Sequence, residues 1–139
     1  FKSPAMTNGT FKTQKDVLNE IVDGCITICE EVGTQKIGEP YGNKKVYDVE
    51  SWYSWNSLDD YEDNVISVEN SYAQMTDYVK SKNEALDTEI KAGIAAARTG
   101  IRGIPAPFRN NLNAKTEIED AMAKLAELAI SLAKLKAVW

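Results

Sequence analysis

The sequence contains no histidine. Histidine is the commonest general base and the commonest protein ligand of transition metals, so this chain cannot build a histidine triad or a histidine-based metal site. The absence also leaves the serines without a base that would activate one of them as a nucleophile. We therefore expect no catalysis by this chain alone.

Cysteine is scarce, and Cys25 and Cys29 are the only thiols. Their four-residue spacing places them one turn apart on one helix face, where sulfur directions rarely suit a disulfide. A redox pair would require a different spacing or a helix N-terminus, and a metal site would require further soft ligands that the chain lacks. The spacing predicts two buried, unpaired thiols in a helical core.

Long apolar runs and an excess of positive charge are missing too. No run approaches the roughly 20 residues of a membrane span, and no basic segment followed by an apolar one resembles a leader, so we expect neither a transmembrane segment nor an export signal in this chain. Sixteen basic residues stand against 21 acidic ones, for a net charge of -5, and the basic residues are scattered. This distribution offers no electrostatic footprint for a nucleic acid.

The apolar residues that are present recur every three or four positions, which is typical of amphipathic helices. A chain of 139 residues fits one domain with a continuous core. The periodicity predicts an all-α fold, an antiparallel four-helix bundle. Its four helices are expected over residues 12–32 with a stop at Gly33, from Ser57 to Tyr72, over residues 76–103 with Pro105 and Pro107 as a stop, and from Ala114 to the end.

The connection between the first two predicted helices, from Gly33 to Asn56, is longer than bundles usually need. A connection of this length must cross the bundle or lie on its end, and we expect the functional surface along it. Residues 1–11 show no periodic pattern and are interpreted as a tail or the remnant of an interdomain segment. The bundle itself is assigned to residues 12–139.

The most polar part of this connection runs from Glu50 into the next helix at Asn64. It combines serines, asparagines and carboxylates with large aromatic residues, three of them (Trp52, Tyr53 and Trp55) before the helix, which is costly surface unless it meets a ligand or another domain. Ser57 is positioned to cap the helix while Asp60 reaches back, as in a capping box.

Four short strings stand out along the chain. They are Asp23-Gly24 within a helix, Lys-Ile-x-Glu-Pro-Tyr at Lys36–Tyr41, Glu-Ser-x-x-Ser-x-Asn-Ser at Glu50–Ser57, and Ile-Pro-x-Pro-Phe at Ile104–Phe108. Together they resemble the imelysin-like family of bacterial envelope proteins. The resemblance covers residues 17–108 and matches the C-terminal half of that family.

The resemblance implies one half of a two-bundle protein that is periplasmic or lipid-anchored and linked to iron uptake. The family's proposed metal or catalytic motif, Gly-x-His-x-x-Glu, belongs to the N-terminal bundle and is not found in this sequence. The expected partners are therefore that N-terminal bundle and a metal ion, such as iron, or a small ligand. The metal would be bound in the complete protein, and we expect no cofactor in this chain alone.

Matching the family's polar signature residue by residue gives the candidate lining of a cleft shared with the other bundle. Glu50 is the best candidate for a metal ligand or an acid/base group, because a carboxylate in a partly closed cleft either meets a cation or shifts its protonation. The candidate residues are Glu50, Ser51, Ser54, Asn56, Ser57, Asp60 and Asn64, with Trp52, Tyr53 and Trp55 as possible aromatic contacts.

Each of these residues also has a structural interpretation. Ser57 and Asp60 would then form only the helix cap, and the aromatic residues would pack within the bundle or against its neighbour. The arginines Arg98, Arg102 and Arg109 would be ordinary surface residues near a helix end, any of which can pair with a loop carboxylate.

Three functional hypotheses follow. In the first, the chain belongs to a metal-associated binding protein of iron uptake, and its oxygen donors complete a site begun by the other bundle. In the second, it is half of a metallopeptidase and supplies substrate contacts. In the third, it is a non-enzymatic domain that recognises a glycan or a protein through Trp52, Tyr53 and Trp55.

Overall fold

The computed structural model describes residues 11–139, which fold into helices joined by turns and contain no strand in that range. The predicted all-α class is confirmed. The tail predicted for residues 1–11 lies, apart from Phe11, outside the described residues. In chain order the elements are α1 Gln14–Glu30, the π-helix η1 Glu31–Gly38, α2 Glu39–Asn43, the 3₁₀ turn η2 Val46–Asp48, α3 Ser57–Ala73, α4 Thr76–Lys82, α5 Glu84–Gly103, η3 Phe108–Asn110, α6 Lys115–Ala133 and η4 Lys134–Ala137.

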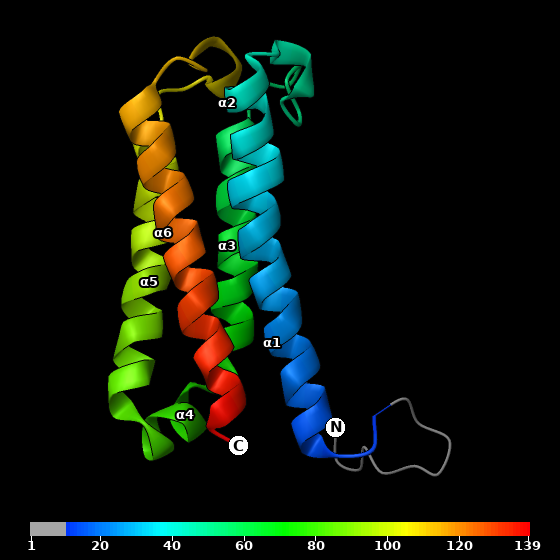
Figure 1. The fold of residues 1–139 in the computed structure, drawn as a ribbon, viewed down its shortest axis with the longest axis vertical. Coiled ribbons are helices and arrows are strands. Elements are labelled where there is room, and N and C mark those ends of the chain that lie inside the picture. Colours follow the sequence, from blue (N-terminus) through cyan, green and yellow to red (C-terminus); the bar gives the residue numbers. More distant parts are fainter. Residues whose placement is uncertain (1–10) are drawn as a thin grey trace.

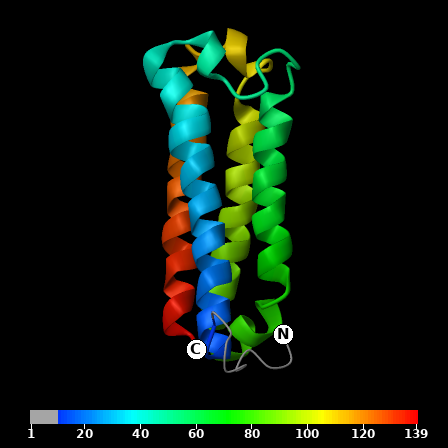
Figure 2. The same ribbon diagram turned by 90° about the vertical axis from the view of Figure 1, so that its right-hand side faces the viewer.

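Four long helices, α1, α3, α5 and α6, lie side by side along the long axis of the molecule (Figures 1 and 2). Successive long helices run in opposite directions, because each connection turns the chain back at one end of the bundle. One end carries residues 44–56 and 104–114, and the other end carries α4. The polar segment that begins at Glu50 therefore lies at one end of the bundle.

Each long helix buries one apolar stripe, and the stripes meet in one core between the helices. Burial of these side chains is the main favourable contribution to folding, at about 25 cal/mol for each Å² of apolar surface removed from water. Leu18, Leu58 and Met122 are only partly buried at the edge of the core. The stripe residues that are no more than 1% exposed include Val22, Cys29, Val65, Val68, Ile90, Ile101, Leu125, Leu128 and Leu132.

The first helix does not end at Gly33, so the predicted stop is wrong. The chain continues through η1 and α2 to Asn43. The two glycines of η1 are explained by close packing: a Cβ on Gly38 would lie 3.0 Å from the Gly33 oxygen and 3.1 Å from Met122 Cε. Within η1 the buried residues Val32 and Ile37 are five positions apart, a spacing that suits the wider π turn and that a search for three- and four-residue periods misses.

The third predicted helix, residues 76–103, is two helices. α4 ends at Lys82, and α5 starts after Asn83, whose side chain accepts a hydrogen bond from the Leu86 amide. Asparagine is a favoured N-cap residue, so the break lies where a cap is available. The apolar spacing continues across it, with Val79 and Leu86 both buried, which is why periodicity alone did not reveal the interruption.

Asp87 joins the three elements around this break. Its carboxylate accepts hydrogen bonds from the Tyr72 hydroxyl of α3 and the Thr76 hydroxyl of α4, both at 2.7 Å, and it pairs with Lys91 Nζ at 2.9 Å. Asp87 is only 4% exposed. Burial alone would raise the pKa of Asp87, but the hydrogen bonds from Lys91, Thr76 and Tyr72 outweigh it and lower the pKa to about 2.

Cys25 and Cys29 are both buried and unpaired, as predicted. Burial raises the pKa of Cys29 to about 12, so its sulfur stays a neutral thiol and packs as a small apolar group. Among the described residues, no helix combines the length and the apolar character needed to cross a membrane.

The close contact between α5 and α6 at Gly100 generates a first prediction. A Cβ on Gly100 would lie 3.0 Å from Ala121 Cα, whereas a Cβ on the exposed Gly24 of α1 would meet nothing within 4 Å. Gly100→Ala is expected to lower the free energy of unfolding by about 1–2 kcal/mol, because crowding outweighs the gain in helix propensity. Gly24→Ala is expected to raise it by up to about 1 kcal/mol. Chemical denaturation measures both, and equal effects would contradict this packing.

A second prediction concerns Asp87 and pH. Because the pKa of Asp87 is about 2 in the folded chain against an ordinary 3.8, its contribution is complete above pH 3.8 and is lost as the pH falls towards 2. Asp87→Asn is expected to lower the free energy of unfolding by about 2–3 kcal/mol at neutral pH. The difference between wild type and variant should shrink below pH 4 in urea titrations. Asp77→Asn, at an exposed position of α4, is the control and should change neither quantity.

Candidate functional site

The predicted polar segment forms a folded loop at the end of the bundle, beside the 104–114 connection (Figure 1). Three non-glycine residues, Lys44, Ser51 and Trp55, have left-handed backbone conformations, with φ of 54°, 55° and 68°. A residue with a side chain adopts this conformation at an energetic cost, so the surrounding contacts must hold it. The loop is therefore a defined structure whose side-chain directions are set.

Glu50 is the predicted site residue with the clearest role in the structure. Its carboxylate forms an ion pair with Lys36 Nζ at 3.0 Å, and its side chain remains 49% exposed. Lys36 comes from η1, directly before the buried Ile37, so the π-helix fixes the point from which the lysine reaches the loop. The end of the bundle thus presents a carboxylate that one lysine holds and solvent still reaches.

Ser57 does not cap α3, so the predicted capping box with Asp60 is wrong. The N-cap position is Asn56, which makes no side-chain cap hydrogen bond. Ser57 is buried, and its hydroxyl instead donates to the Glu50 carbonyl oxygen at 2.6 Å. This bond ties the start of α3 to the loop residue that carries the exposed carboxylate.

The other predicted polar residues are used locally. The Ser54 hydroxyl donates to the Ser51 carbonyl oxygen at 2.9 Å, and the Asn64 amide donates to the Asp60 carbonyl oxygen at 2.7 Å. Asp60 and Asn64 lie one turn apart along α3, away from the loop turn that contains Ser51 and Ser54. The structure therefore brings Glu50 and Ser57 together and spreads the remaining candidates over the loop and the helix.

The aromatic residues divide into a packed one and two exposed ones. Trp52 is partly buried and meets the Tyr47 ring edge-on, with centroids 5.0 Å apart. Tyr53 and Trp55 are 74% and 51% exposed. The packing interpretation thus describes Trp52, whereas Tyr53 and Trp55 present aromatic surface to solvent.

Arg109 holds this loop in place, which the sequence did not reveal. Its guanidinium lies 3.6 Å from the centroid of the Trp55 ring, and its Nη1 donates to the Trp52 carbonyl oxygen at 2.8 Å. The other two arginines serve α3 instead: Arg98 and Arg102 both pair with Glu62. No local pattern identified Arg109, because its contacts are more than fifty residues away in the sequence.

Tyr61 lies directly beneath this region and is fully buried, with its ring edge-on to Phe108. Burial raises the pKa of Tyr61, and the negative charge of Glu50 raises it further, so the hydroxyl stays protonated. That hydroxyl has no hydrogen-bond partner among the described residues. The sequence did not single out Tyr61 for a function, and it marked Lys36 only as part of the Lys36–Tyr41 string.

The arrangement offers one carboxylate that a lysine holds and that solvent still reaches. Within residues 11–139, no three acidic or cysteine side chains converge as they would to hold a metal ion. Glu50 supplies one oxygen ligand, and a cation there would compete with Lys36 for it.

Comparison with known proteins agrees with the arrangement of the helices. The sequence matches the family model described as Imelysin over residues 2–138. No curated protein matches the chain. An imelysin peptidase from Bacteroides ovatus superimposes with a TM-score of 0.89 and 37% identity, over 96% of this chain and 43% of that protein. A candidate iron-regulated protein A precursor from Parabacteroides distasonis gives a TM-score of 0.91 and 29% identity, over 96% of this chain and 44% of that protein.

The chain thus spans less than half the length of either of these structures. Within that span the resemblance is close in both fold and sequence, and the family model covers nearly every residue. On this basis the chain belongs to the imelysin family.

Proposed function

We propose that this chain is the non-catalytic half of a longer imelysin-family protein of the bacterial envelope, and that it contributes Glu50 to a metal or ligand site shared with a second helical bundle. The observation that carries the proposal is the half-exposed Glu50 carboxylate, held 3.0 Å from Lys36 at the end of the bundle. Ser57 fixes the backbone at Glu50 itself, and Arg109 fixes it two residues further on, at Trp52. A carboxylate oriented in this way needs little rearrangement to meet a ligand.

The name of one of the two similar structures supports a role in iron uptake. One is named as an iron-regulated protein A precursor and the other as an imelysin peptidase. Iron uptake on the periplasmic side of the envelope, with or without a lipid anchor, fits the first name. A role in iron uptake also fits the chemistry of Glu50, because a carboxylate oxygen is a suitable ligand for a hard cation such as ferric iron.

Peptidase activity, by contrast, would depend on the other half. Metal-assisted hydrolysis requires a set of ligands with an open position for water. This chain has no histidine, and among the described residues no three acidic or cysteine side chains converge. In such an enzyme the present half would supply substrate contacts near Glu50.

A second candidate function is recognition of a glycan or a protein by the exposed aromatic rings. Tyr53 and Trp55 present large aromatic surface at the same end of the bundle, and Arg109 fixes the orientation of Trp55. Aromatic side chains combine an apolar face with a polar edge and are favoured at recognition surfaces. Loss of binding on Trp55→Ala with unchanged metal content would favour this candidate over the metal site.

The role of Glu50 is tested by Glu50→Gln in the longer polypeptide that carries both bundles. The substitution keeps the shape of the side chain and removes the charge, so iron binding is expected to weaken about tenfold or more. Because Glu50 is half-exposed and lies at the end of the bundle, the thermal unfolding midpoint should hardly change. Iron titration by calorimetry and iron content by mass spectrometry measure the effect.

The matched control for Glu50→Gln is Glu20→Gln, the same change at an exposed position of α1. It should leave iron binding unchanged. Equal iron affinity for wild type and Glu50→Gln would remove Glu50 from the site.

The role of Arg109 is tested by Arg109→Lys, which keeps the charge but removes the planar group that stacks on Trp55. Amide hydrogen exchange of residues 49–56 is expected to accelerate about tenfold, because the stack and the bond to Trp52 are both lost. Exchange in the core of α5 should be unaffected. Arg102→Lys, in an exposed ion pair on α5, is the control. Unchanged exchange in the loop would show that Arg109 does not hold it.

A further inference from the structure

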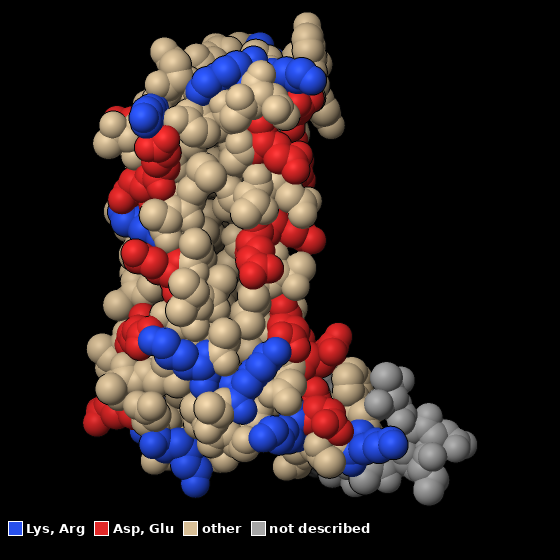
Figure 3. All heavy atoms as spheres, in the orientation of Figure 1, with Lys and Arg blue, Asp and Glu red and all other residues tan. Residues whose placement is uncertain are grey.

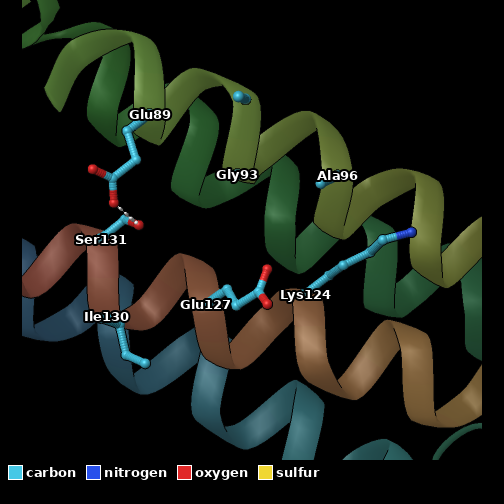
Figure 4. Close-up of a pocket in the computed structure, with 8 residues that line it drawn as sticks. Glu89, Gly93, Ala96, Lys124, Glu127, Ile130 and Ser131 are labelled. Carbon is cyan, nitrogen blue, oxygen red and sulfur yellow. Dashed lines mark hydrogen bonds between the residues drawn. The ribbon is translucent and has the colours of Figure 1, made fainter. Parts of the chain in front are cut away.

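The side of the bundle formed by α6 and its two neighbours carries features that the site at the end does not use. A groove of about 430 Å³ lies between α5 and α6, with Gly93 and Ala96 on one wall and Glu127 on the other. Figure 4 shows Lys124 and Glu127 on α6 beside this groove, while Glu89 of α5 reaches across to the Ser131 hydroxyl. The small residues of α5 leave the groove open.

A second groove, of about 610 Å³, follows the other side of α6, between that helix and α1 with η1. Thr27, Glu30 and Thr34 form one wall, and Ala126 and Ala133 form the other. The two grooves share Ile130, so α6 is a ridge with a groove on each side. Such a surface has the shape onto which a further helix packs, because side chains of one helix fit into the grooves beside another.

The crest of this ridge has a regular pattern. Its residues are exposed and recur at alternating three- and four-residue intervals, the heptad spacing of a helix that packs against a helical partner. All are alanine except Ile130, which is 63% exposed and is the large apolar side chain at the centre. The inward face of the same helix repeats this spacing in the core. The outward residues are Ala123, Ala126, Ile130, Ala133 and Ala137.

The charges beside the grooves indicate the character of the partner. On this face of the bundle, acidic side chains lie on both sides of a strip of uncharged residues (Figure 3). Glu30, Glu31 and Glu127 form no ion pair within the described residues, whereas Lys124 pairs with Asp120 and Lys134 pairs with Glu89. The uncompensated charge beside the ridge is therefore negative, and it suits a partner with lysine or arginine next to its apolar stripe.

A second copy of this chain fits the face poorly. Two copies packed through α6 would bring the grooves of both copies together, and with them the carboxylates of Glu30, Glu31 and Glu127. Like charges placed opposite one another across an interface cost several kcal/mol. The occupant that satisfies both the shape and the charge is a different helix.

We propose that the α6 face docks an amphipathic helix with small or apolar residues at heptad spacing and lysine or arginine beside them, supplied by the part of the longer imelysin-family polypeptide that this chain does not span. The similar structures continue for more than half their length beyond the matched region, so such a segment is available. The docked helix would lie against Thr34 and Gln35, immediately before Lys36. The inference extends the shared-site proposal by naming the surface that the second half occupies.

The chemistry of the occupant is tested with a synthetic four-heptad helix that carries alanine and isoleucine at positions a and d and lysine at e and g. A second helix with glutamate at e and g is its control. We expect the lysine helix to bind at least about tenfold more tightly than the glutamate helix, with an affinity that falls as salt rises. Fluorescence anisotropy measures the affinity, and amide NMR shifts should map the contact to α6.

Substitutions in the chain complete this test. Ala126→Arg places a large cation on the ridge and should weaken binding of the lysine helix about tenfold or more. Ala95→Arg is the matched control, an exposed alanine of α5 outside the two grooves, and should leave the affinity unchanged. Equal binding of both helices, or equal loss in both variants, would overturn the proposal. A dimer in analytical ultracentrifugation that Ala126→Arg dissociates would assign the face to a second copy and overturn it too.

The source of the helix is tested in the polypeptide that carries both bundles. Amide hydrogen exchange should be slower for residues 123–134 there than in the isolated chain, because the docked helix covers them. Unchanged exchange would overturn the proposal. Amide exchange in α6 and iron affinity are independent measurements. Slower exchange in α6 together with an unchanged iron affinity of Glu50→Gln would reject the metal site alone. Unchanged exchange in α6 together with a weakened iron affinity of Glu50→Gln would reject the docking surface alone.

Discussion

The fold depends on how closely α6 approaches its neighbours. Gly93 and Gly100 of α5 face Leu128 and Ala121 of α6, and a Cβ on either glycine would lie within 3.2 Å of an α6 atom. On the other side, a Cβ on Gly38 of η1 would lie 3.1 Å from Met122 Cε, and a Cβ on Gly33 would meet Leu125 Cβ at an ordinary contact distance of 3.4 Å. The large side chains of α6 therefore fill space that the neighbouring elements leave empty. Because both neighbours depend on the same helix, the position of α6 determines the direction of α5 and of η1.

This constraint explains which parts of the fold the sequence could predict. Regular three- and four-residue spacing identified the all-α class and the buried faces of α3, α5 and α6, because a straight helix repeats its contacts regularly. It failed at Gly33, where the glycine serves contact with α6 and the chain widens into a π turn with Val32 and Ile37 five residues apart. It failed again at Asn83, because Val79 and Leu86 keep their spacing across a break made by a cap.

The candidate site was less predictable for a related reason. The sequence identified Glu50 and Ser57 as polar residues of an unusual connection, and the structure joins them through the Glu50 carbonyl oxygen. It did not indicate that Lys36 pairs with Glu50 or that Arg109 binds the Trp52 carbonyl, because each residue meets the loop only after the helices have packed. Ser57 was assigned to a cap on local grounds, whereas its hydroxyl is used in a contact seven residues back. Side-chain roles that depend on long-range contacts do not appear as a local pattern.

The π-helix connects the two surfaces that we assign to function. Its widened turn buries Ile37, which directs the preceding Lys36 towards Glu50 at the end of the bundle. The same element places Thr34 and Gln35 on the wall of the groove beside α6. A helix docked in that groove would therefore contact the segment that positions Lys36. A cation bound at Glu50 would compete with Lys36. The proposed docking of the second bundle and the proposed binding at the loop would therefore act on the same few residues, and a change in the packing of η1 would affect both.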